Sequence, residues 1–163
     1  PEASDGCIVL SNNDLLEIEN VLNTIDTPII LSNLSINELS LRTEDSIQED
    51  QKRLLNSIEK WRRSWISANY PEYINFYSND AMYNNSIYKK WTYIKKTVLK
   101  KSKDIKISIS DISIYEYPSI DEQLRIVFFK QNYSSNLITN TTKKKQLWKE
   151  KNGEWKIIYE GTI

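Results

Sequence analysis

The stretch that decides the fold is residues 54–77, LLNSIEKWRRSWISANYPEYINFY. Four large apolar side chains recur in it at i, i+4, i+7 and i+11, on one face of an α-helix: Leu54, Ile58, Trp61 and Trp65. Pro71 ends this helix near Asn69, because proline disfavours a helical residue before it but suits the first turn of a new helix. The stretch therefore predicts a long amphipathic helix that bends into a short one. The short helix adds three aromatic side chains to the same core, Tyr73, Phe76 and Tyr77.

Another amphipathic helix is predicted to begin at Ser86, with an apolar stripe at the same spacing: Ile87, Trp91, Ile94 and Val98. Its remaining faces are rich in lysine: Lys89, Lys90, Lys95, Lys96, Lys100 and Lys101. A run of charge on a helix is usually a solvated face, and we interpret these lysines in that way. The alternative is a surface that attracts anionic wall polymers.

From Ile105 onward the apolar period changes from helical to two, which indicates strands. The parity breaks near Ser110-Asp111, where a β-bulge would absorb one extra residue. Residues 124–133 form a second strand with apolar side chains on both faces. Residues 143–149 and 154–160 form a hairpin across Asn152-Gly153, with Trp155, Ile157 and Tyr159 on one side. We interpret Lys143-Lys144-Lys145 as charges that protect an edge strand from pairing.

The order of elements, helices first and antiparallel strands afterwards, predicts an α+β domain with helices packed on one face of a curved sheet. Before it, residues 1–31 carry a short strand, a helix that begins at Ser11-Asn12 and a second short strand. This segment is too short to form its own core. We therefore expect three parts: 1–31, a linker over 32–46, and the α+β domain over 47–163. Because the chain lacks an initiator Met, we expect it to be a fragment of a longer protein.

Composition excludes several kinds of site. The chain has no histidine, so a Ser-His-Asp or Cys-His pair and a histidine zinc site cannot form within it, and one cysteine cannot build a thiolate zinc cage. Its three glycines lie far apart and form no phosphate loop. We therefore predict neither metal nor cofactor. With 22 basic and 22 acidic residues, the chain has no general attraction for nucleic acid. No apolar run is long enough for an integral membrane segment.

The first residues carry a more specific signal. Ser4-Asp5-Gly6-Cys7 and the following Ile8 to Leu15, with Thr27-Pro28 further on, resemble the end of the L,D-transpeptidase catalytic domain. That family modifies bacterial peptidoglycan through a cysteine acyl-enzyme. The resemblance implies that residues 1–31 are the remnant of an all-β-type catalytic domain with Cys7 as nucleophile. It also implies that the amides of Gly6 and Cys7 meet the oxyanion, and that Ser4 and Asp5 shape the pocket.

The chain departs from that family in two respects. Val9 stands where many members carry arginine, and the activating histidine belongs upstream of the cysteine. Without it, the thiol keeps an ordinary reactivity, so we expect this chain alone to be inactive.

Residues 51–163 resemble the nuclear transport factor two-like (NTF2-like), or cystatin-like, cone domain. The resemblance is carried by Trp61-Arg62-Arg63-Ser64-Trp65, residues 73–80, Trp91 and Trp155-Lys156-Ile157. Such a domain follows the catalytic domain in some L,D-transpeptidases of cell-shape systems, and it holds a pocket between helices and sheet. Aromatic side chains are the predicted pocket residues: Trp65, Tyr73, Tyr77, Trp91 and Tyr133. The alternative is that most of them simply form the core.

These resemblances predict part of a peptidoglycan L,D-transpeptidase or L,D-carboxypeptidase in the bacterial cell envelope. Its cone domain would bind peptidoglycan stem peptides, glycan strands or a second copy of the chain. The first alternative is a non-catalytic binding or dimerisation module, with Cys7 a relic. The second is a small-molecule isomerase or dehydratase within the cone, for which Asp111 is the carboxylate we would nominate.

Overall fold

The computed structural model describes residues 10–19, 29, 44–79, 85–117, 119 and 121–163. The chain divides into two compact units, 1–31 and 32–163, which are described separately. In the first unit, helix α1 spans Asn12–Glu19. The predicted cap is present, because the Ser11 hydroxyl accepts a hydrogen bond from the Asp14 amide (3.1 Å). The predicted flanking strands lie mostly outside the described residues; Leu10 and Ile29 are described and are not in strands.

In the second unit, α3 (Glu44–Ile66) and α4 (Tyr70–Asn75) confirm the predicted bent helix pair. The predicted stripe is the buried face of α3, since Leu54, Ile58, Trp61 and Trp65 are at most 8% exposed. The bend lies at Ala68, which adopts a positive φ of 53°, and at Asn69, whose side chain caps α4 by accepting from the Glu72 amide (3.4 Å). Helix α3 begins inside the linker predicted for 32–46.

Helix α5 spans Asn85–Lys101, but its buried face differs from the predicted stripe. Ile94 and Val98 are 48% and 43% exposed, whereas Leu99 is 3% exposed and Trp91 is half-buried. Trp91, Lys95 and Leu99 follow one another at intervals of four, so Lys95 lies on the inward face. The prediction that Lys95 belongs to a solvated face was wrong.

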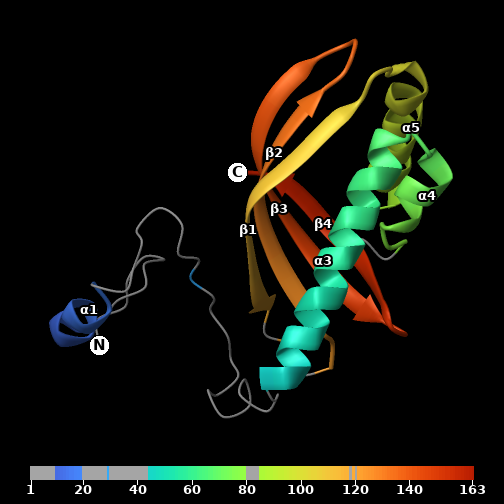
Figure 1. The fold of residues 1–163 in the computed structure, drawn as a ribbon. Coiled ribbons are helices and arrows are strands. Elements are labelled where there is room, and N and C mark those ends of the chain that lie inside the picture. Colours follow the sequence, from blue (N-terminus) through green and yellow to red (C-terminus); the bar gives the residue numbers. More distant parts are fainter. Residues whose placement is uncertain (1–9, 20–28, 30–43, 80–84, 118, 120) are drawn as a thin grey trace. The chain divides into compact units, whose positions relative to one another are not determined.

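The four strands form one antiparallel sheet in chain order. They are β1 (Lys106–Tyr117), β2 (Leu124–Ser134), β3 (Thr139–Lys151) and β4 (Glu154–Thr162). The helices lie on one side of this curved sheet (Figure 1), which confirms the predicted α+β architecture. Because β3 lies inside the sheet, the interpretation of Lys143-Lys144-Lys145 as edge protection was wrong.

Two bulges set which side chains face the helices. The predicted one interrupts the β1–β2 register between Ser110 and Ser113, with Asp111 at a φ of 54°. A second one, not predicted, lies in β4: Trp148 pairs with Ile157 and Leu147 pairs with Tyr159, which leaves Ile158 as the extra residue. Trp155 and Ile157 therefore face the helices, but Tyr159 faces the opposite side. The expectation that all three share one face was wrong.

The core between helices and sheet is dominated by aromatic rings. Trp61 packs edge-on against Trp65 and Phe129, with ring centroids 5.4 and 6.1 Å away. Tyr77 joins the helices to strand β4, because Ser78 and Phe76 on either side exchange backbone hydrogen bonds with Ile157 (2.9 and 2.7 Å). Among the described residues, no helix is long and apolar enough to cross a membrane.

Candidate functional site

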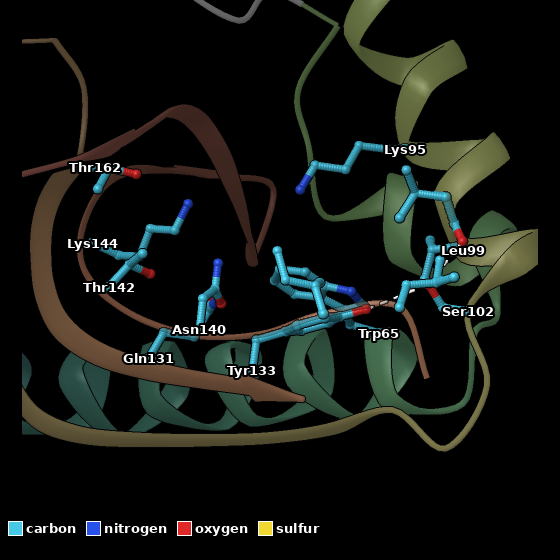
Figure 2. A pocket seen from close by; sticks show the side chains of 13 residues that line it. Trp65, Lys95, Leu99, Ser102, Gln131, Tyr133, Asn140, Thr142, Lys144 and Thr162 are labelled. Carbon is cyan, nitrogen blue, oxygen red and sulfur yellow. Dashed lines mark hydrogen bonds between the residues drawn. The ribbon is translucent and has the colours of Figure 1, made fainter. Parts of the chain in front are cut away.

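A cavity of about 270 Å³ opens between α5, the end of α3 and the sheet. Its floor is aromatic, and polar side chains rise from the sheet (Figure 2). The residues that line it come from both layers: Trp65, Lys95, Val98, Leu99, Ser102, Gln131, Tyr133, Leu137, Ile138, Asn140, Thr142, Lys144 and Thr162. Figure 2 shows Lys95 from α5 and Lys144 from β3 both extending into the hollow.

The sheet register explains how the polar residues come together. Gln131 of β2 pairs with Thr142 of β3, and Tyr133 pairs with Asn140. Lys144 lies two residues beyond Thr142, so it points to the same face and pairs with Thr162 of β4. The inward face of the sheet thus changes from apolar to polar where it leaves the aromatic core.

Glu160 lies behind the cavity and is 8% exposed at its side chain. Its carboxylate accepts hydrogen bonds from the Tyr77 hydroxyl (2.8 Å) and the Gln146 amide (2.9 Å), and it pairs with the Lys144 ammonium (3.4 Å). Burial alone would raise the pKa of Glu160. Lys95, Lys144 and the two hydrogen bonds outweigh that effect and hold the pKa below its ordinary value. The carboxylate is therefore ionised at neutral pH.

The ammonium of Lys95 rests on ring faces, 4.7 Å from the Trp65 centroid and 5.6 Å from that of Trp91. Burial lowers the pKa of Lys95; Glu160 opposes this shift, and Lys144 adds to it. Two cations thus line the cavity, and one anion, Glu160, lies behind them. Since Glu160 is already engaged by Tyr77, Gln146 and Lys144, the balance toward a ligand is positive.

Tyr77 holds the carboxylate in place and is itself held by Tyr73 and Trp61. The Tyr77 hydroxyl accepts from the Trp61 indole (3.1 Å) and shares a hydrogen bond with Tyr73 (2.9 Å). Burial, reinforced by Glu160, raises the pKa of both tyrosines well above the ordinary value, so both remain protonated donors. On the other side, Gln146 is fixed by the Trp148 indole, which donates to its carbonyl oxygen (3.0 Å).

Two polar atoms of the cavity wall have no hydrogen-bond partner among the described residues. They are Oε1 of Gln131, whose residue is 3% exposed, and Oγ1 of Thr142. Buried polar groups without a partner are uncommon in folded proteins, because each loses its bonds to water. Both residues line the cavity on neighbouring strands.

The residues predicted from sequence fall into four groups. Trp65 and Tyr133 line the cavity. Tyr73, Tyr77 and Trp91 lie outside its lining; Tyr73 and Tyr77 are buried, and Trp91 packs against Tyr77 with ring centroids 4.7 Å apart. The four residues predicted for catalysis, Ser4, Asp5, Gly6 and Cys7, lie outside the described residues. Asp111 is exposed on the β1 bulge.

Sequence reasoning missed Lys95, Lys144, Glu160 and Gln131 as site residues. The doublet Ile157-Ile158 breaks the alternation of β4, and it is the signal that could have placed Glu160 inward. For Lys95, the signal was its position four residues from both Trp91 and Leu99. For Gln131, the sequence offered only its place two residues after Phe129.

A helical layer on a curved antiparallel sheet, with a cavity between them, defines an NTF2-like domain. Residues 53–161 match the family model of the Cds6 C-terminal NTF2-like domain, and the chain belongs to this family. No curated protein matches the chain significantly.

Several solved structures share the fold. Bd1075 of Bdellovibrio bacteriovorus is 24% identical, with a TM-score of 0.69 over 97% of this chain and 56% of its own. The K307A mutant of the helical cell shape determining protein Pgp2 from Campylobacter jejuni is 23% identical, with a TM-score of 0.73 over 96% and 53%. A putative dehydratase of the NTF2-like family from Streptomyces avermitilis is 5% identical, with a TM-score of 0.57 over 71% and 96%. The chain therefore spans about half the length of the first two structures.

Proposed function

We propose that this chain is a peptidoglycan-binding part of a cell-envelope protein, and that its cavity holds the ligand. The observation that carries the proposal is that Lys95 and Lys144 enter one cavity, and that the Glu160 carboxylate behind it is already engaged by its neighbours. Peptidoglycan stem peptides carry carboxylates, which suit such a site. The similarity to a cell shape determining protein supports the same setting.

Charge is a better basis for recognition here than ring stacking. Trp65 and Tyr133 are only 8% and 7% exposed, so they offer little ring surface to a sugar. We therefore expect stem peptides rather than glycan strands to enter the cavity.

An enzyme within the cone is less well supported. The dehydratase or isomerase chemistry for which Asp111 was nominated needs a carboxylate or imidazole that can reach the substrate. The described residues that line the cavity include no aspartate, glutamate or histidine, and Asp111 lies exposed on the bulge. Similarity in fold to a putative dehydratase at 5% identity does not supply those groups.

Co-sedimentation with purified peptidoglycan sacculi tests the proposal. Wild-type protein is expected in the pellet, and Lys144→Met should lower the bound fraction severalfold. Lys145→Met is the matched control, because Lys145 points to the opposite face of β3 and lies over Tyr159. Equal binding by both variants and the wild type would refute a role for the cavity.

We propose further that the whole protein is an L,D-transpeptidase or L,D-carboxypeptidase with Cys7 as nucleophile. The matches to Bd1075 and the Pgp2 mutant cover 97% and 96% of the chain, so they extend into residues 1–31. Intact mass after incubation of the full-length protein with a carbapenem should reveal an adduct, which Cys7→Ser abolishes. A folded full-length protein that forms no adduct would favour the non-catalytic binding or dimerisation module.

A further inference from the structure

We propose that the cavity recognises the free C-terminal residue of a peptide, through its carboxylate and its own amide N–H. This inference rests on the proposed function and names the part of the ligand that enters. Three features of the cavity wall support it: a pair of cations, a buried acceptor without a donor, and an apolar rim.

The cations favour a carboxylate. Among the residues that the structure describes, the Lys95 ammonium contacts the faces of Trp65 and Trp91, which cannot take the directed hydrogen bonds that an ammonium makes. Those N–H groups are therefore left for a ligand or for water. Lys144 contributes a second cation from the facing layer, already oriented by Glu160 (3.4 Å). A carboxylate can accept from both, because its two oxygens offer about four lone-pair sites.

The unpaired acceptor requires a hydrogen-bond donor, which a carboxylate lacks. Oε1 of Gln131 is buried in the cavity wall beside the Thr142 hydroxyl, and neither has a partner among the described residues. A peptide amide N–H would satisfy Gln131. In a C-terminal residue, this nitrogen and the carboxylate carbon share one Cα and lie about 2.5 Å apart. Thr142 and Lys144 are two residues apart on one face of β3, a separation of about 7 Å. The amide N–H and the carboxylate of one bound residue can therefore reach Gln131, beside Thr142, and Lys144 at the same time.

The rim of the cavity suits a small apolar side chain. Val98, Leu137 and Ile138 line the opening and are 43%, 56% and 55% exposed. The hairpin that carries Leu137 and Ile138 is fixed to the end of α5, because Asn136 exchanges hydrogen bonds with the backbone of Lys103 (3.1 and 2.6 Å). A methyl group at the Cα of the bound residue would lie against this rim.

The test compares two dipeptides, N-acetyl-D-alanyl-D-alanine and its C-terminal amide, by NMR titration of the whole chain. The free acid is expected to bind at least tenfold more tightly than the amide. Lys95→Met should remove this difference, whereas Lys96→Met, an exposed lysine over the Tyr70 ring, should preserve it. A third ligand, methylated at the last amide nitrogen, should bind severalfold more weakly than the free acid.

The outcomes separate this inference from the proposed function. If the wild-type protein binds the free acid and the C-terminal amide with equal affinity, the inference is wrong, and no variant is needed to show it. Sacculi that bind through Lys144, with no dipeptide binding, overturn it while the proposed function stands. Acid-selective dipeptide binding without sacculus binding supports the inference and refutes the proposed function. No binding of either refutes both.

Discussion

Tyr77→Phe is the substitution that tests most directly how the cavity is supported. The change removes one hydroxyl and keeps the ring, so packing against Tyr73 and Trp91 persists. The hydroxyl donates to Glu160 (2.8 Å) and accepts from the Trp61 indole (3.1 Å). Since its single proton goes to Glu160, the Tyr73 hydroxyl must donate the hydrogen bond that joins the two tyrosines (2.9 Å).

The magnitude follows from what remains after the hydroxyl is gone. A hydrogen bond to a charged group contributes about 1.5–3 kcal/mol, and a buried donor without an acceptor costs about 1–3 kcal/mol. The Trp61 indole and the Tyr73 hydroxyl both lose this acceptor, and because both residues are 0% exposed, water cannot replace it. Both effects come from one atom and are not fully additive. We expect the free energy of unfolding to fall by about 3 kcal/mol.

Urea unfolding followed by tryptophan fluorescence measures this loss. With an m value of about 2 kcal/mol per molar urea, the midpoint should fall by about 1.5 M. Tyr93→Phe is the matched control, because Tyr93 is 72% exposed, and its midpoint should stay near that of the wild type. If Tyr77→Phe changes stability by less than about 0.5 kcal/mol, the Tyr77 hydroxyl does not hold Glu160 in place.

Two further predictions concern helix α3. Leu54 is 0% exposed, so Leu54→Ala should lower the free energy of unfolding by about 2–5 kcal/mol. Leu55 is 42% exposed, so Leu55→Ala should lower it by under about 0.5 kcal/mol. Urea unfolding measures both losses, and equal losses would contradict the assignment of Leu54 to the buried face of α3. Glu59→Gln should cost about 0.5 kcal/mol at pH 7 and low salt, since Glu59 is 38% exposed and its ion pairs are screened. The Arg62 hydrogen bond, opposed by burial and aided by Arg63, lowers the pKa of Glu59 from 4.5 to about 2. The loss of stability caused by Glu59→Gln should therefore have its full size above pH 4.5 and vanish as the pH falls through about 2. If the urea midpoints of variant and wild type differ equally at pH 7 and pH 2, this prediction is wrong.

Local patterns in the sequence were sufficient for most of the fold. The spacing of Leu54, Ile58, Trp61 and Trp65 identified the central helix because a helix that packs on a sheet buries one continuous stripe. Asn152-Gly153 identified the β3–β4 hairpin for an equally local reason: both residues adopt a positive φ there, 55° and 84°. These signals depend on neighbours in the chain, so they are readable without the tertiary structure.

The cavity could not be predicted in the same way, because its members break the local pattern. Lys95 is a charged residue on a buried face, and its position there depends on the charge of Glu160 and on the rings of Trp65 and Trp91. Ile94 and Val98 are apolar yet exposed, with Val98 on the cavity rim. A rule that places apolar residues inside and charges outside is therefore wrong in both directions in this one helix.

The bulge at Ile158 explains why charges can be accommodated inside the fold. Without the extra residue, strict alternation would put Tyr159 inward and Glu160 outward. Lys95 and Lys144 would then share the interior without a counter-charge, an arrangement that costs several kcal/mol per ion. With the bulge, the carboxylate reaches Tyr77, Gln146 and Lys144. Even so, apolar residues of similar volume commonly give equal or greater stability than a buried ion cluster. Stability alone therefore does not account for these charges, whereas a site that binds an anion requires them.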